Sequence, residues 1–519
     1  MVVVHPENPT RSITRTELRR ILRAEVQEWS SRDTIQLLLP RSGSSEKRVL
    51  LDLVYDMNDL QLKRYWTRLI YEHRIVEAPL SVPSPAVALR TLERMRGSLT
   101  VVPASALQGS VRAKVLAIDG ILPGDEGYPL WLDSPSIVEH RASTPKRVSE
   151  ASAARDEEPA AASAEQQEVL ERLATLEEAL ATQRDGMPSL SWRLFGHMEA
   201  EYEEDSTAGE PPANNAFSIE VLDLLITSAL SERFSILTET VFEALDDNEF
   251  DIEVERLILK YRFSDALSIQ GGRFLTTLGY WNSKYHHGEW LQTSIDRPEI
   301  LNFEGDDGIL PLHSVGVSLK GAFFGEALSA DYALEVANGR GPTPDEAQDK
   351  LDANDEKALN LSIGLQPSAV PGLRLGGGTY IDNIPMNIDP GAGQVHGDLD
   401  ERITNAYWAY EDSHWEAMGE YFWIDHEGAG VATESSGWYL QVGRRLADFV
   451  PYVRLDAAHL DDQDPYFGTS DDTSTVALGV RYDPVRWVAL TLQYERTNID
   501  APAGDPNGRT NTVVLQATF

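Results

Sequence analysis

The sequence predicts an all-β, 16-stranded antiparallel transmembrane barrel over residues 189–519, preceded by a small α/β domain and a short coiled coil. Three observations support this fold class. Apolar residues alternate with polar ones from residue 191 onward, short connections alternate with long ones, and no run of 18 apolar residues could form a membrane helix. The predicted segments are an α/β domain over 1–120, a linker over 121–164, a coiled coil over 165–185 and the barrel over 189–519.

The composition limits the classes of site and partner. The 519 residues include no Cys, which excludes disulfides, thiolate metal sites and a lipid-modified cysteine. The formal charge is −38, and most of the acidic excess lies in the predicted barrel. Such a surface disfavours nucleic acid as a partner. It indicates either acidic, solvated loops or a pore that prefers cations.

The first segment has the pattern of an α/β domain. Val2–Val4 predicts a strand, the capping box Thr14-Arg-Thr-Glu17 opens a helix, and Asp59–Tyr71 predicts another helix. The remaining predicted elements are strands at 35–39 and 98–102, helices at 49–55 and 82–96, and a weak strand at 115–121.

Several short motifs of this domain suggest a family. Val-Val-His-Pro-Glu-Asn-Pro9 is followed by a Ser-rich turn at 42–45, by Tyr65-Trp66 and by Gly97–Ala104. This order resembles the second part of a phosphate-type periplasmic substrate-binding domain, whose members bind an oxyanion at a Ser/Gly turn that starts a helix. The resemblance implies possible anion binding at Ser42, Gly43, Ser44 and Ser45. The alternative is that the turn only caps the helix.

The coiled coil is predicted from apolar spacing. Val169, Leu173, Leu176 and Leu180 recur at 4-3-4 spacing, about two and a half heptads, with charged residues between them. Such a short coiled coil requires another contact to hold the chains together. The alternative is a single amphipathic helix on a domain surface.

The barrel is predicted from alternation and loop length together. Leu490, Leu492 and Tyr494 alternate with polar residues, a pattern that a soluble sandwich also shows, with its apolar face inside. Tight connections such as Asp412–Ser413 alternate with long acidic ones such as 280–312, which is expected of outer-membrane barrels. The predicted strands are 191–204, 217–231, 234–246, 250–263, 266–279, 313–325, 327–338, 357–367, 371–381, 401–411, 414–425, 436–446, 450–460, 473–482, 487–498 and 511–519.

The barrel and the coiled coil together resemble the phosphate-selective (O/P-type) porins. Phe519 on an alternating last strand resembles the C-terminal signal that the barrel-assembly machinery recognises. The resemblance implies a homotrimer in contact with outer-membrane lipid, with its N-terminal domain in the periplasm. No secretory signal opens the chain at Met1–Pro6, so we expect that the signal peptide is missing from this sequence.

The implied function is a water-filled channel for passive diffusion of small hydrophilic solutes or ions. The alternative is a barrel that anchors a periplasmic anion-binding module. By the same resemblance, the third long loop narrows the pore, with candidates Lys284, His286, His287, Glu289, Asp296 and Arg297. Alternation gives the pore-lining candidates Arg193, Glu199, Lys260, Arg262, Arg273, Arg454, Arg481 and Glu495.

Catalysis, metal binding and cofactor binding are not predicted. His286-His287 is the one histidine pair considered, but adjacent strand residues point to opposite sides and no further ligand follows at metal-binding spacing. His459 has no serine partner at motif spacing, and no nucleotide-binding glycine motif is present. An outer-membrane hydrolase is therefore the least favoured hypothesis.

Overall fold

The computed structural model describes most of the chain. The described residues are 1–107, 112–130, 188–205, 214–244, 250–286, 288–302, 308–344, 354–387, 396–428, 430–468, 471–501 and 507–519. The predicted coiled coil over 165–185 and the predicted linker from residue 131 onward lie outside these residues, as does His287.

The N-terminal region contains a five-stranded sheet with the strand order β4-β3-β5-β1-β6 and a two-stranded sheet β2-β7. Its strands are β1 (Val2–Val4), β2 (Ser12–Ile13), β3 (Gln36–Pro40), β4 (Leu80–Val82), β5 (Ser98–Val101), β6 (Lys114–Val115) and β7 (Ala117–Ile118). Its helices are α1 (Arg15–Leu22), α2 (Ser45–Leu50), the π-helical turn η1 (Leu51–Tyr55), α3 (Asp59–Tyr71), α4 (Pro85–Arg94) and the short turn η2 (Ala104–Leu107).

Local capping explains where these helices begin. Thr14 and Glu17 form the predicted capping box of α1, and Asn58 and Gln61 form a second one at the start of α3. The helix predicted from residue 82 begins only at Pro85, because Ser84 is extended and caps it. The residues before it form β4, which the sequence analysis missed.

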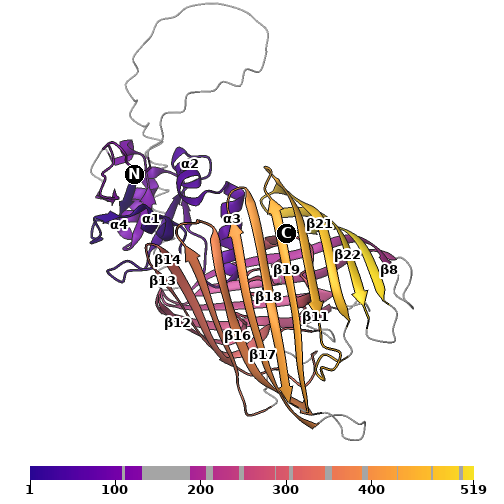
Figure 1. Cartoon of the computed structure of the whole chain (residues 1–519). Helices are drawn as coiled ribbons and strands as arrows, with labels where there is room; N and C mark the ends of the chain where they lie inside the picture. The colour runs from indigo at the N-terminus through magenta and orange to yellow at the C-terminus, as the bar shows by residue number, and fades with distance from the viewer. Residues whose placement is uncertain are drawn as a thin grey trace, which may run out of the picture.

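The barrel is a closed sheet of 16 strands, β8 to β23, in which every neighbouring pair is antiparallel and β23 pairs with β8 (Figure 1). This confirms the predicted strand number and closure. The strands are β8 (Ser189–Asp205), β9 (Asn214–Ala229), β10 (Phe234–Ala244), β11 (Phe250–Ser264), β12 (Leu267–Leu275), β13 (His313–Phe324), β14 (Leu328–Ala337), β15 (Ala358–Pro367), β16 (Leu373–Asn387), β17 (His396–Glu411), β18 (Trp415–Gly428), β19 (Val431–Arg444), β20 (Phe449–His459), β21 (Asp472–Val485), β22 (Val488–Asp500) and β23 (Gly508–Thr518).

Strands β16 to β19 are longer than predicted. Residues 382–400 were expected to form a long loop, yet β16 continues to Asn387 and pairs with β17 from His396. Ile384, Met386 and Leu399 are buried on the inner side of these extensions. Burial of these apolar side chains favours strand over exposed loop in this segment.

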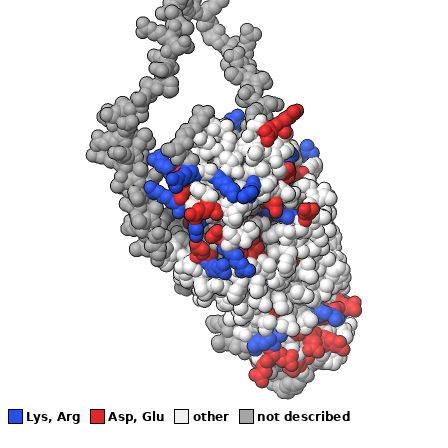
Figure 2. Space-filling model, turned by 90° about the vertical axis from the view of Figure 1, so that its left-hand side faces the viewer, with Lys and Arg blue, Asp and Glu red and all other residues white. Residues whose placement is uncertain are grey.

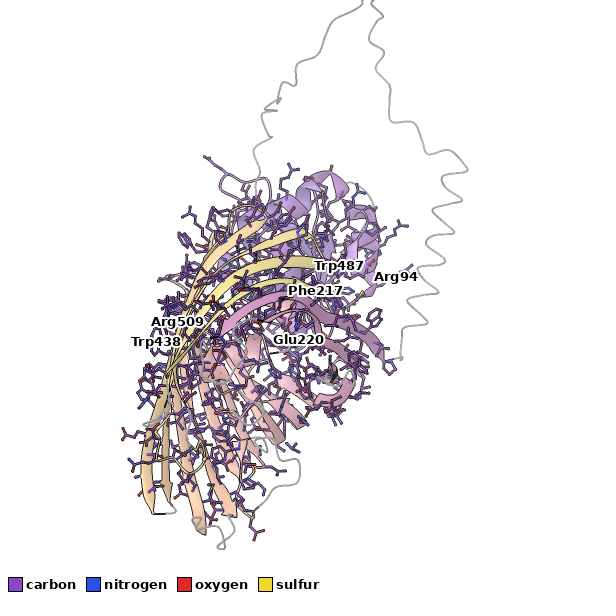
Figure 3. All side chains as sticks on the ribbon, turned by 90° about the vertical axis from the view of Figure 1, so that its right-hand side faces the viewer. Arg94, Phe217, Glu220, Trp438, Trp487 and Arg509 are labelled. Atoms are coloured by element: carbon purple, nitrogen blue, oxygen red, sulfur yellow. The ribbon has the colours of Figure 1, made fainter. Side chains whose placement is uncertain are left out.

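The outer face of the barrel is apolar. Leu490, Leu492 and Leu515 are 37%, 48% and 50% exposed, whereas Thr491 and Gln493 between them are buried. The wall below the N-terminal region shows few charges, and mainly acidic residues gather at its lower end (Figure 2). The exposed aromatic residues Phe217, Trp438 and Trp487 lie on this outer side (Figure 3). This arrangement is inverted relative to a soluble sandwich, and the barrel is a transmembrane one.

Among the described residues, no helix has the length and hydropathy needed to cross a membrane.

The outward orientation of Leu492 can be tested by stability. We expect Leu492→Arg to lower the free energy of unfolding in lipid vesicles by about 2–4 kcal/mol, because a charge would enter the hydrocarbon. Leu122→Arg makes the same change at an exposed leucine of the N-terminal region and should cost less than about 0.5 kcal/mol. Equal effects in urea titrations of the two variants would contradict the assignment.

Candidate functional site: the barrel lumen and its inserted segments

The N-terminal region docks on the barrel end that carries the short turns. Arg20 donates to the carbonyl of Gly325 at 2.6 Å, in the turn between β13 and β14. The backbone N–H of Gln27 donates to Asp265 at 3.1 Å, in the turn between β11 and β12. Lys63 donates to the carbonyl of Arg486 at 2.9 Å, in the turn between β21 and β22. These contacts involve three different turns of the rim, and the region lies at this end of the barrel, with α3 reaching toward its middle (Figure 1).

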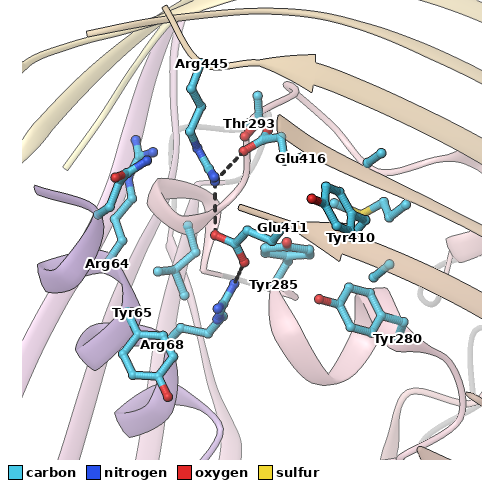
Figure 4. A pocket seen from close by; sticks show the side chains of 15 residues that line it. Arg64, Tyr65, Arg68, Tyr280, Tyr285, Thr293, Tyr410, Glu411, Glu416 and Arg445 are labelled. Carbon is cyan, nitrogen blue, oxygen red and sulfur yellow. Dashed lines mark hydrogen bonds and ion pairs between the residues drawn. The ribbon is translucent and has the colours of Figure 1, made fainter. Parts of the chain in front are cut away.

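Helix α3 crosses this end and is held by a row of ion pairs (Figure 4). Arg68 donates to Glu411 at 2.9 Å, and Arg445 donates to the other oxygen of Glu411 at 3.0 Å and to Glu416 at 2.8 Å. One turn earlier, Arg64 pairs with Asp483. Charged hydrogen bonds of this kind are shorter and stronger than neutral ones, so they fix α3 against β17 to β21.

The end of α3 lies deeper inside the barrel. The carbonyl of Tyr71 accepts from Arg256 at 2.7 Å, and that of His73 accepts from Lys260 at 2.6 Å. The carbonyl of Val76 accepts from the hydroxyl of Thr227 at 2.7 Å. The last carbonyls of a helix have no partner within the helix and carry partial negative charge. Basic side chains of β11 supply the missing donors here, so the barrel wall completes the helix end.

The described residues of the loop 280–312 lie in the barrel lumen. The N–H of Tyr280 donates to Glu420 at 2.8 Å, and the hydroxyl of Ser294 donates to Gln441 at 2.9 Å. Arg454 donates to the carbonyls of Ile295 and Asp296, both at 2.9 Å. These partners belong to the inner faces of β18, β19 and β20, so the loop lies along the inside of the wall.

Several predicted constriction residues contact the wall or α3. Lys284 pairs with Glu72 at the end of α3 at 2.6 Å, and Glu289 pairs with His197 of β8. His286 is buried beside β11 and β13. Asp296 contributes its carbonyl to Arg454, and Arg297 is half-buried on the same loop. Lys284 and Glu289 therefore anchor the loop to the end of α3 and to the wall. That the candidate residues narrow a pore stays a prediction.

The predicted pore-lining residues form three groups. Lys260, Arg454 and Arg481 hold the inserted segments, since Arg481 donates to the carbonyl of Trp290 at 2.9 Å. Other members pair with wall residues: Glu199 accepts from Gln516 at 2.7 Å, Arg273 donates to Glu253 at 2.5 Å, and Glu495 accepts from Arg454 at 2.8 Å. Arg262 contacts Thr34 of the N-terminal region at 3.3 Å, and Arg193 bonds to Ser191 at 3.1 Å.

An apolar cluster joins α3, the loop and the wall. Ile70 and Tyr71 of α3, Leu291 and Ile300 of the loop, and Phe195 of β8 belong to the same buried cluster. The lumen of this structure is therefore packed over part of its cross-section. The predicted water-filled passage would have to run through the rest of the cross-section.

A cavity lies between the N-terminal region and strands β11 to β17. Its empty volume is about 1530 Å³, including its opening to solvent. Basic residues outnumber acidic ones along its wall, against the overall acidity of the chain. The basic residues are Arg74, Arg256, Lys260, Arg262, Lys284, Lys320 and Arg374, and the acidic ones are Glu25, Glu72, Asp265 and Asp331.

The predicted anion-binding turn acts as a helix cap. The hydroxyl of Ser44 accepts from the N–H of Lys47 at 3.1 Å, and Ser42 donates to the carboxylate of Asp59 at 3.3 Å. Gly43 and Ser45 are exposed, and Gly43 has a φ of +82° that favours glycine. A carboxylate beside the turn repels an anion, so the geometry favours the capping interpretation.

Comparisons with known proteins give likeness at the level of fold. No family model and no curated protein matches the chain. An anion-selective porin from Comamonas acidovorans has a similar structure, at 11% identity and a TM-score of 0.46, over 64% of this chain and 100% of that chain. The outer membrane channel DcaP of Acinetobacter baumannii matches at 11% identity and a TM-score of 0.42, over 64% and 97%. OmpF of Salmonella typhi matches at 10% identity and a TM-score of 0.45, over 63% and 97%. Likeness of this degree carries no argument about activity.

Docking of α3 should depend on pH through His73. Its ring lies 3.0 Å from the hydroxyl of Ser235, and burial lowers its pKa well below the usual value, with Lys260, Arg256 and Lys320 acting in the same direction. The undocked state binds a proton below about pH 6.5 and the docked state does not, so docking weakens as pH falls. We expect the undocked-to-docked ratio to rise up to about tenfold per pH unit below that value.

Distances between spin labels can measure this equilibrium. The chain has no Cys, so Arg48→Cys on α2 and Ala369→Cys in a barrel turn, both exposed, provide a clean label pair. A longer distance should gain population from pH 7 to pH 5, and His73→Gln should remove the pH dependence attributable to this residue. Identical pH profiles with and without His73→Gln would contradict its role.

Proposed function

We propose that this protein is an outer-membrane channel of the porin type for small hydrophilic solutes or ions, whose short-turn end is closed by its own N-terminal region. The observation that carries the proposal is a closed 16-stranded barrel with an apolar outer face and a polar inner face. Its lumen holds a helix end, a long loop and still a cavity. An anchor without transport would not require this inner space.

The short turns define the orientation that we propose. Outer-membrane barrels place their short turns at the periplasmic side and their long loops outside. The N-terminal region docks on the short-turn end and would therefore lie in the periplasm. The homotrimer, the coiled coil over 165–185 and assembly by the barrel-assembly machinery stay predictions from the sequence.

The cavity beside α3 is the proposed path for solutes. Lys260, Lys320 and Arg374 project into it from β11, β13 and β16. Charges lining a narrow passage select ions by sign, whatever the charge of the distant surface. We therefore propose that this cavity favours small anions, although the chain as a whole has a formal charge of −38.

The docked position of α3 corresponds to a closed or restricted state. Its ion pairs with Glu411 and Asp483 and its apolar contacts with the loop must break for the lumen to widen. This coupling distinguishes the proposal from an open porin. The alternative, a barrel that displays an anion-binding module, is less favoured because the candidate turn caps a helix beside Asp59.

Cross-linking the segment that follows α3 to the wall should lock the closed state. Val76 and Thr227 are joined by a 2.7 Å hydrogen bond, so Val76→Cys with Thr227→Cys gives a thiol pair within reach of a short cross-linker. In planar bilayers, we expect the cross-linked protein to conduct at least about tenfold less than the same protein after reduction, because α3 can no longer move. Each single cysteine variant should be insensitive to the reagent. Unchanged conductance after complete cross-linking would contradict gating by this helix.

Charge reversal in the cavity beside α3 should change the ion preference of the channel. Lys320 is partly exposed to the cavity and lies 3.6 Å from Glu335, so Lys320→Glu replaces a cation by a second carboxylate. The reversal potential in a salt gradient should shift toward cation preference, whereas Arg94→Glu on the exposed face of α4 should leave it unchanged. If Lys320→Glu leaves the reversal potential unchanged while the conductance is normal, the ion path does not pass Lys320.

A further inference from the structure

Three residues that are far apart in the sequence meet inside the lumen. Glu255 comes from β11, His286 from the loop 280–312, and His313 is the first residue of β13. Their side chains are 2%, 0% and 1% exposed, and one ligand atom from each lies within 4.8 Å of the other two. In the sequence, the nearest histidine to His286 is its neighbour His287. The structure instead joins His286 to a histidine and a glutamate from the wall.

The ligand atoms face one another. Nε2 of His313 lies 2.6 Å from Oε2 of Glu255, and Nε2 of His286 lies 3.7 Å from the same oxygen. The two rings are 5.1 Å apart and nearly perpendicular, at 73°. Ligands at 2.0–2.1 Å from a tetrahedral ion are roughly 3.3 Å apart. Small movements of two side chains on a loop and a strand end would reach that spacing.

A β-bulge aims Glu255 into this site. Glu239 of β10 pairs with Arg256 and the next residue, Thr240, pairs with Val254, so Glu255 is the extra residue on β11. Both Glu255 and Arg256 are therefore buried on the inner side, where regular alternation would place only one of them. Bulges are enriched beside functional sites, where they redirect a side chain.

The surrounding charge favours a cation. Asp223 and Glu239 are fully buried near Glu255, and Glu253 lies on the same strand, with Arg256 and Arg273 as the basic partners. Arg256 pairs with Glu239 and Arg273 pairs with Glu253, so these two ion pairs offset one another's charge. A divalent cation held by two neutral imidazoles would offset the buried negative charge of Glu255.

We propose that Glu255, His286 and His313 bind a divalent first-row transition metal of the Zn²⁺ class. Two imidazoles and one carboxylate, with a water molecule as fourth ligand, form a known donor set for such ions. The bound ion would link His286 near the start of the loop 280–312, and His313 directly after it, to Glu255 of β11. Because Arg256 follows Glu255 and holds the end of α3, the site also stabilises the docked helix.

A second histidine–carboxylate group differs from this one. His197 contacts Glu199 at 3.8 Å, Glu220 at 3.1 Å and also Glu289. It contains a single imidazole among three carboxylates, one of them exposed. This composition is that of a protonated histidine in an ion-pair cluster, and it supplies a control for the metal experiment.

The test is Zn²⁺ titration of the full-length protein after treatment with a chelator, followed by calorimetry. An excess of Mg²⁺ occupies oxygen-only sites on the acidic loops. We expect one Zn²⁺ per chain, and His286→Ala, His313→Gln and Glu255→Gln should each weaken binding by at least about 100-fold, since loss of an outer partner alone costs 10–100-fold. His197→Gln and His459→Ala should leave the affinity unchanged.

Two further readouts keep the test decisive. Co²⁺ in place of Zn²⁺ should give the visible absorption of a four-coordinate ion, and Zn²⁺ should slow hydrogen exchange in the loop 280–312. If a strand variant fails to fold, His286→Ala carries the test because it lies on the loop. Absence of stoichiometric binding, or binding that survives His286→Ala and is lost in His197→Gln, would overturn the proposal.

Discussion

The closed sheet in lipid is the constraint from which the rest of this structure follows. A barrel in hydrocarbon must turn its apolar residues outward, so its charged and amide side chains are enclosed in the lumen. Buried charges are costly unless they find partners. Helix α3 and the loop 280–312 supply many of these partners: Glu411 binds Arg68, Glu420 accepts from the backbone of Tyr280, and Arg454 donates to the loop carbonyls.

The two inserted segments support one another. Lys284 of the loop pairs with Glu72 at the end of α3, and Tyr71 of α3 packs in the same apolar cluster as Leu291 of the loop. Burial alone would raise the pKa of Glu72, yet Lys284, Arg74 and Arg68 outweigh it and hold that pKa below its usual value. The carboxylate therefore stays charged at neutral pH, and movement of either segment would disturb the other. This is the physical basis for treating the docked helix as part of the packed barrel interior.

The sequence predicted most elements but few of their contacts. The limits of α3 at Asp59 and Tyr71 follow from a capping box and from helical spacing, which are local signals. Its insertion into the barrel has no local signal, because Arg68 and Glu411 are 343 positions apart. Arg256 has the same inward phase as the predicted pore-lining residues Lys260 and Arg262, but its contact with Tyr71 has no local signal. The direction of Glu255 depends on the bulge, which turns it inward beside Arg256. Likewise, His286 has no visible metal partner until the barrel closes and brings His313 and Glu255 beside it.

Spin labels placed one at a time at residues 490–493 of β22 test the orientation of the sheet most directly, since no native cysteine interferes. Collision with oxygen, which concentrates in hydrocarbon, is compared with collision with a water-soluble nickel chelate. The account predicts high oxygen accessibility at Leu490 and Leu492, and low accessibility to both reagents at Thr491 and Gln493, which are packed inside. High oxygen accessibility at Thr491 and Gln493 with low accessibility at Leu490 and Leu492 would contradict this account. Accessibility to the nickel chelate at all four positions would also contradict it.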